Sequence, residues 1–116
     1  MQYLLMIYED EAAFEGGEDG AAWRDVVAAH EAFSGELVAA GVMRGGAGLK
    51  PVATATTVRT RDGAKTLHDG PWAETKEQLG GFYQIEAADL DAALAWARKV
   101  PLAQDGSIEV RPILDM

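Results

Sequence analysis

Unbroken apolar character marks the first strand of this chain. Residues 3–8 (YLLMIY) are apolar at every position, so an extended chain carries apolar side chains on both of its faces. A small domain with few helices can cover one face of its sheet with them, and the other face then needs a different cover. The sheet of a second subunit is the simplest cover, so we predict a homodimer.

A spacing of three and four residues between apolar positions predicts an amphipathic helix over residues 23–38. Its apolar stripe consists of Trp23, Val26, Val27, His30, Phe33, Leu37 and Val38. Asp19 is suited to cap the start of this helix, and Gly41 is suited to close its end. The acidic, glycine-rich residues 9–20 before the helix are expected to form a solvated loop.

The middle of the chain carries the signals of a hairpin. Residues 45–48 (GGAG) predict a flexible connection, whereas the alternating threonines, valine and alanines of residues 52–61 predict a strand. Residues 62–63 (DG) favour the positive φ angles of a tight turn, so residues 65–68 are expected to pair back against that strand. Residues 82–86 (FYQIE) predict a further strand.

The last third of the chain predicts a helix and then a strand. Asp89 can cap a helix over residues 90–100 that stops at Pro101, and the alternation in residues 107–113 predicts the closing strand. The resulting order β-α-β-β-β-α-β matches the split β-α-β plan, in which both helices lie on one face of a mainly antiparallel sheet. We therefore predict a single α+β domain of the ferredoxin-like type over residues 1–116.

Composition narrows the classes of function. The formal charge of −9 disfavours nucleic acid and membrane surfaces as partners, because both are bound through clusters of Lys and Arg. The chain has no cysteine and only two histidines, His30 and His68, so a Cys/His metal centre cannot be assembled. We expect no metal and no other cofactor. The first residues lack the basic region of a signal peptide, so we expect a cytoplasmic protein.

Two side chains are the leading candidates for catalysis, His30 and Asp69. The imidazole of His30 should point toward the sheet, either as a general acid or base tuned by a carboxylate or as a buried histidine satisfied by one hydrogen bond. The turn at residues 70–71 (GP) can hold the Asp69 carboxylate in a fixed orientation, which makes it a candidate partner for His30. Aspartate at this place in a turn also accepts hydrogen bonds from backbone amides, and the two roles can coexist.

Polar and aromatic side chains follow Asp69 closely along the chain. Glu74 and Lys76 can line a cleft and Trp72 and Tyr83 can form its apolar wall, so we predict that these four residues bind a substrate. A solvated surface loop is the alternative. Residues 80–81 (GG) indicate a β-bulge or the close approach of another backbone.

Three stretches of the chain together resemble one family. Residues 69–77 (DGPWAETKE), 79–83 (LGGFY) and 106–112 (GSIEVRP) are similar to the DGPF-domain branch of the YCII-related proteins, which are bacterial, and the similarity runs nearly end to end. The resemblance implies a dimeric α/β-barrel, in which two ferredoxin-like subunits pack their sheets face to face. It also implies a histidine on the first helix, which His30 matches. The aspartate that YCII proteins carry before the proline after the second helix is replaced here by Val100.

Three functions remain open at this point. The first is a small-molecule-binding dimer with His30 and Asp69 as an acid–base pair for a proton transfer or a simple lytic step. The resemblance implies the second, a non-catalytic regulatory protein that associates with a sigma factor of the extracytoplasmic-function type. The third is a cofactor-free oxygenase of the dimeric α/β-barrel kind, which rests on analogy of fold alone.

Overall fold

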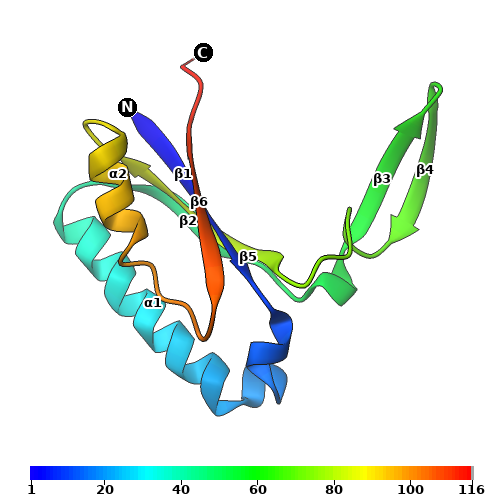
Figure 1. Ribbon diagram of the computed structural model, residues 1–116, viewed down its shortest axis with the longest axis horizontal. Coiled ribbons are helices and arrows are strands. Elements are labelled where there is room, and N and C mark those ends of the chain that lie inside the picture. Colours follow the sequence, from blue (N-terminus) through cyan, green and yellow to red (C-terminus); the bar gives the residue numbers. More distant parts are fainter. Residues whose placement is uncertain (116) are drawn as a thin grey trace.

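Both helices cover the same face of a four-stranded antiparallel sheet (Figure 1). The computed structural model describes residues 1–115. Its sheet runs in the order β2-β5-β1-β6 and consists of β1 (Gln2–Glu9), β2 (Met43–Gly48), β5 (Gln78–Glu86) and β6 (Gly106–Pro112). The helices are α1 (Ala21–Ala39) and α2 (Leu90–Ala97). This arrangement confirms the predicted α+β fold of the ferredoxin-like type.

Strand β2 lies where the sequence predicted a flexible connection. It pairs with β5 at the edge of the sheet, with Gly46 opposite Tyr83 and Gly48 opposite Gly81. The prediction was wrong because glycine has a low propensity for strands. In this sheet, however, the backbones of β2 and β5 lie too close together at Gly46 for a side chain. A Cβ on Gly46 would lie 2.9 Å from the carbonyl oxygen of Phe82. The observed order therefore contains one more strand than predicted.

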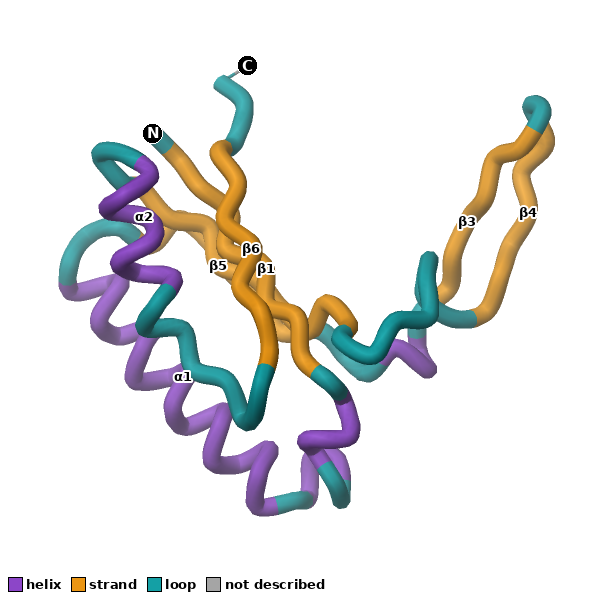
Figure 2. Tube along the Cα trace, in the orientation of Figure 1, coloured by secondary structure: helices purple, strands orange, loops and turns teal. Residues whose placement is uncertain are grey.

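The predicted hairpin is present, but it forms a separate two-stranded sheet. Strands β3 (Thr56–Arg61) and β4 (Ala64–Asp69) pair with each other and project away from the four-stranded sheet (Figure 2). We call residues 56–69 the arm. Asp62 and Gly63 at its tip have φ angles of +53° and +79°, which confirms the predicted turn. Residues before Thr56 form the short 3₁₀ helix η3 (Val52–Thr54), so the strand begins later than predicted.

Several predicted boundaries shift by a few residues. The segment predicted as a solvated loop begins with the end of β1 and continues as two 3₁₀ helices, η1 (Glu11–Phe14) and η2 (Gly17–Asp19). Asp19 therefore lies in η2, and the residue that precedes α1 is Gly20. At the end of α1, Gly41 adopts a φ of +73°, as predicted. The Asp89 side chain caps α2 by accepting a hydrogen bond from the backbone amide of Ala92 at 2.9 Å.

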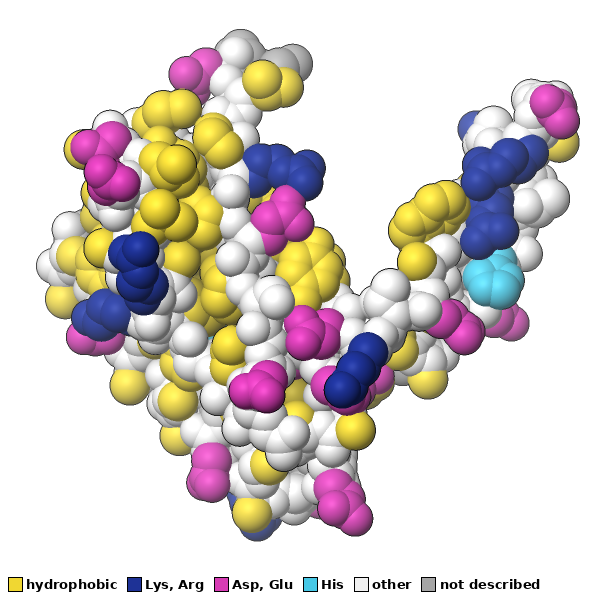
Figure 3. All heavy atoms as spheres, viewed as in Figure 1, with side chains coloured by type: hydrophobic (Ala, Val, Ile, Leu, Met, Phe, Trp, Pro, Cys, Tyr) yellow, Lys and Arg dark blue, Asp and Glu magenta, His cyan; other side chains and the backbone are white. Residues whose placement is uncertain are grey.

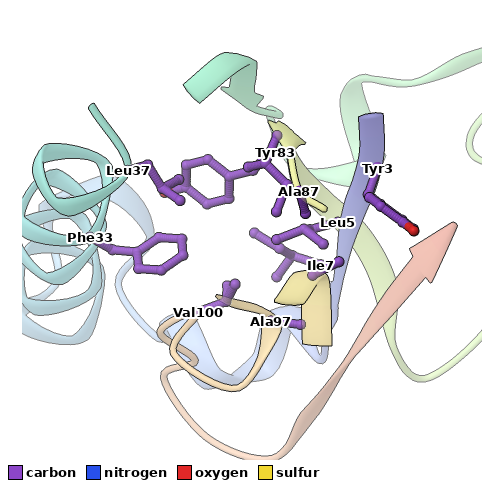
Figure 4. Packing of buried hydrophobic residues seen from close by; sticks show 11 residues of the cluster. Tyr3, Leu5, Ile7, Phe33, Leu37, Tyr83, Ala87, Ala97 and Val100 are labelled. Carbon is purple, nitrogen blue, oxygen red and sulfur yellow. The ribbon is translucent and has the colours of Figure 1, made fainter. Parts of the chain in front are cut away.

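The hydrophobic core lies between the helices and the inner face of the sheet (Figure 4). Leu5 and Ile85 are fully buried on neighbouring strands β1 and β5. Phe33 and Leu37 reach them from α1 and are also buried. Burial of one such side chain contributes about 1.5–3 kcal/mol, so this cluster holds α1 against the sheet.

The outer face of the sheet carries no helix, and it is apolar along β1 and polar along β6, where Ser107, Glu109 and Arg111 lie opposite β1. Leu4, Met6 and Tyr8 of β1 are only half-buried, as is Phe82 of β5, and they alternate with the buried inner positions. A notch separates the body of the molecule from the arm (Figure 3). Within residues 1–115, no helix is both long enough and apolar enough to cross a membrane.

Candidate functional site

A cavity of about 590 Å³ lies on the helix side of the sheet, between α1 and the edge formed by β2 and β5. We call it the α1 cavity. Its existence follows from three glycines, because Gly46, Gly48 and Gly81 occupy positions whose side chains would point toward α1. Without side chains there, the space between the edge of the sheet and the helix stays open. The volume falls within the range of about 300–1,000 Å³ that is usual for small-molecule sites.

His30 and Tyr83 meet at the wall of the α1 cavity. His30 Nδ1 lies 2.7 Å from the phenolic oxygen of Tyr83, and the two rings are stacked with their centroids 5.8 Å apart. Ser34, one helical turn after His30, donates its hydroxyl proton to the same phenolic oxygen at 3.4 Å. The inward orientation predicted for His30 thus brings it against β5, and Tyr83 is its partner.

Burial determines the charge of this pair. It lowers the pKa of His30 below its ordinary value of 6.5, an effect that the backbone carbonyl of Pro101 opposes. Burial also raises the pKa of Tyr83, an effect that the hydrogen bond from Ser34 opposes. At neutral pH the imidazole is therefore neutral and the phenol is protonated. In that state the Tyr83 O–H donates to His30 Nδ1, and the Ser34 O–H donates to Tyr83.

Glu9 is a third ionisable group at the α1 cavity, and sequence reasoning missed it. It continues the inner face of β1 and is only 9% exposed, and within residues 1–115 no other charged side chain is as deeply buried. Its Oε2 accepts a hydrogen bond from the backbone amide of Ala103 at 3.0 Å. Burial raises the pKa of this carboxyl group, and the Ala103 amide opposes that effect. A signal for it was available, since position 9 continues the alternation of Leu5 and Ile7.

Asp69 lies elsewhere in the subunit. It is exposed at the end of the arm, where it lines a second hollow of about 490 Å³ together with Glu74 and Lys76. Glu11 and Gln78 contribute to both this hollow and the α1 cavity, so the two are neighbours. Within one chain, however, His30 and Asp69 do not line the same cavity.

The other two predicted substrate-binding residues, Trp72 and Tyr83, lie in different places. Tyr83 lines the α1 cavity, whereas Trp72 lines neither hollow and is 64% exposed. The guanidinium groups of Arg59 and Arg61 lie over the Trp72 ring, 5.1 and 5.8 Å from its centroid. Val100, which stands where the resemblance implies an aspartate, is 7% exposed and belongs to the apolar core.

For Gly80 and Gly81 the sequence indicated a β-bulge or a close approach of another backbone, and the structure contains both. The pairing of β1 with β5 shifts by one residue between Ile7 and Tyr8, which leaves Gly80 as the extra residue of a bulge. A Cβ on Gly81 would lie 2.9 Å from the carbonyl oxygen of Ala47, so the backbones of β5 and β2 approach closely there.

Residues 1–115 contain no group of three or more His, Asp or Glu side chains arranged to hold a metal ion.

Comparison with known proteins identifies the family. The family model of the YCII-related domain matches residues 1–116. An uncharacterized protein (R00369) of Rhizobium meliloti (strain 1021) is 42% identical over 118 residues, which cover 97% of this chain and 92% of that protein. The chain therefore belongs to the YCII-related domain family.

Proposed function

We propose that the protein binds a small molecule in the α1 cavity and that Tyr83 and His30 pass a proton to or from that molecule. The observation that carries this proposal is the 2.7 Å contact between His30 Nδ1 and the Tyr83 hydroxyl at the wall of a cavity of about 590 Å³. The other walls are largely apolar, contributed by side chains such as Val26 and Trp23. An apolar cavity with a few convergent polar groups is the usual form of a ligand site.

The pair is suited to a proton relay. A bound molecule gives its proton to the Tyr83 oxygen while Tyr83 gives its own proton to His30 Nδ1. The phenol is unchanged at the end of this step, and the imidazole holds the proton as an imidazolium ion. Because burial keeps His30 neutral at pH 7, the imidazole is ready to accept. The reverse movement returns the proton to the bound molecule.

Tyr83 is therefore a better supported partner for His30 than Asp69 is. The predicted pairing of His30 with Asp69 requires the carboxylate to approach the α1 cavity from outside the subunit. Only a second chain, through its own arm, would bring such a carboxylate there. Replacement of Asp69 by Asn tests this pairing. If Asp69 is the partner of His30, the variant should change the pH dependence of ligand binding at the α1 cavity.

We further infer that the protein is a homodimer joined through the outer face of the sheet. This face presents Leu4, Met6 and Phe82 half-buried and without a covering helix. The arm supports the same inference, because an isolated two-stranded hairpin is at best marginally stable in water. Val58 and Leu67 on the arm are also 61% and 75% exposed. A second copy that packs sheet to sheet covers the outer face and gives the arm a surface to contact.

The cavity proposal is tested by filling the cavity. A Cβ on Gly48 has no atom within 4 Å, so Gly48→Leu places a side chain into open space. Fragments that shift the NMR signals of His30 and Tyr83 in the wild-type protein are expected to lose that effect in the variant. Gly35→Ala on α1 is the matched control, because its Cβ also meets open space and Gly35 does not line the cavity.

Equal binding of the same fragments to wild type and Gly48→Leu would show that the α1 cavity is not the site.

The regulatory alternative makes a different prediction. If a sigma factor is retained by the dimer while no fragment enters the cavity, association with that factor accounts for the protein better than ligand binding does.

A further inference from the structure

The charged side chains that line the α1 cavity are all acidic. Four carboxylates line it, and within residues 1–115 no Lys or Arg does: the four are Glu9, Glu11, Glu18 and Glu31. Two of them already have partners, since Glu11 accepts from the Val52 amide at 2.9 Å and Glu18 pairs with Lys50 at 3.2 Å. Anionic ligands are therefore repelled, whereas cationic ones are attracted.

Glu9 differs from the other three carboxylates because it is buried. One of its oxygens accepts the hydrogen bond from Ala103, and within residues 1–115 no hydrogen bond to the other oxygen is present. A carboxylate has about four acceptor sites, so most of its capacity is unused. The second oxygen keeps some contact with solvent, but the side chain is only 9% exposed, and a carboxylate largely removed from water is destabilised unless a cation or further donors compensate. A cation within the cavity would provide that compensation.

Aromatic rings complete the surroundings of such a cation. Phe14 and Trp23 line the cavity and contact each other edge to face, with centroids 5.4 Å apart. Tyr83 lines it from the side of the sheet. Ring faces attract cations electrostatically, and the same rings accommodate the apolar part of a ligand.

We propose that the α1 cavity takes an organic cation, a protonated amine on an apolar body, with the Glu9 carboxylate as its counter-ion. This inference rests on the proposed binding function of the same cavity and specifies the class of ligand. It is carried by the buried carboxylate, the absence of lining Lys and Arg within residues 1–115, and the aromatic walls.

Three probes with one body and different heads test the inference: 2-phenylethylamine, 2-phenylethanol and 3-phenylpropionate. Titrations followed by NMR are expected to give the tightest binding for the amine and the weakest for the carboxylate. Glu9→Gln should weaken amine binding by about 30-fold, since truncation of one member of a buried charge pair has at least that effect. Binding of the alcohol should stay within about twofold.

Glu31→Gln is the matched control, because it removes the same charge from an exposed lining position. It should weaken amine binding far less than Glu9→Gln does. A measurement on the wild-type protein avoids dependence on the fold of the variant: the ratio of amine affinity to alcohol affinity should fall as pH is lowered and Glu9 is protonated. His30 lines the same cavity and contributes in the same direction as it becomes a cation.

Each other outcome is decisive. If the alcohol or the propionate binds in the cavity as tightly as the amine, or if Glu9→Gln weakens all three equally, the inference about cations is wrong and the cavity remains a binding site. If the amine fails where other fragments bind, the same conclusion holds. If neither these probes nor any fragment enters the wild-type cavity, both the inference and the proposed function are wrong.

Discussion

Replacement of Tyr83 by Phe isolates the hydroxyl group on which the proposed relay depends. The ring itself is buried, and it packs edge to face against Phe33 with centroids 5.1 Å apart, a contact that phenylalanine retains. What disappears is the oxygen that joins His30 at 2.7 Å and Ser34 at 3.4 Å. The change therefore removes two hydrogen bonds and leaves the packing in place.

The expected loss is about 1–2 kcal/mol in the free energy of unfolding at pH 7. A net hydrogen bond contributes about 0.5–1.5 kcal/mol, and a buried partner left unsatisfied adds to the loss. His30 and Ser34 are only half-buried, so water replaces part of what they lose. Removal of the whole ring, as in Tyr83→Ala, should instead have an effect of about 3–5 kcal/mol.

Urea unfolding measures this difference in stability, provided that the unfolding free energy depends on urea concentration with the same slope in both proteins. NMR of the imidazole ring measures a second consequence, the change in the pKa of His30. Donation from the Tyr83 hydroxyl favours the neutral imidazole, so Tyr83→Phe should raise the pKa of His30. If Tyr83→Phe leaves both the stability and the pKa of His30 unchanged, the hydrogen bond is not formed in solution and the relay fails.

Two further predictions concern pH and assembly. Because the folded pKa of His30 lies below its unfolded value of about 6.5, its contribution to stability is full above pH 6.5 and is lost as pH falls through the folded pKa. His30→Gln should therefore lose less stability than wild type between pH 7.5 and 5 (about 1.5 units below the unfolded pKa), and an identical slope in both proteins would contradict the assignment. Glu9, whose pKa is raised, contributes in the opposite direction in both proteins and cancels in the comparison. Met6→Glu on the outer face should convert dimers to monomers, as measured by light scattering, whereas Ala28→Glu on the exposed side of α1 should not. If the mass of Met6→Glu is unchanged, the outer face is not the interface.

Local signals in the sequence predicted much of the fold. The apolar residues 3–8, the Asp62-Gly63 turn and the Asp89 cap all depend on neighbours in the chain, and the structure confirms each of them. Strand β2 could not be predicted in this way, because its glycines lack strand propensity and its place in the sheet is determined by pairing with β5.

The candidate site depended more strongly on contacts between distant residues. His30 and Tyr83 were both singled out from the sequence, but their contact joins residues 53 positions apart and requires the fold. Asp69 was assigned to His30 because turn chemistry is local, whereas the insertion of the arm between β2 and β5 carries Asp69 to a different hollow. Glu9 was overlooked because an acidic run was interpreted as solvated, although alternation along β1 turns it inward.

The titration of His30, measured by NMR with and without a fragment bound in the α1 cavity, tests the central claim most directly. The account predicts a pKa below 6.5 in the free protein and a clear change of that pKa when the cavity is occupied. It also predicts that Gly48→Leu shows no such change on addition of the same fragment. A His30 titration that is identical in the presence and absence of every bound fragment would contradict the claim that this cavity and this histidine form one site.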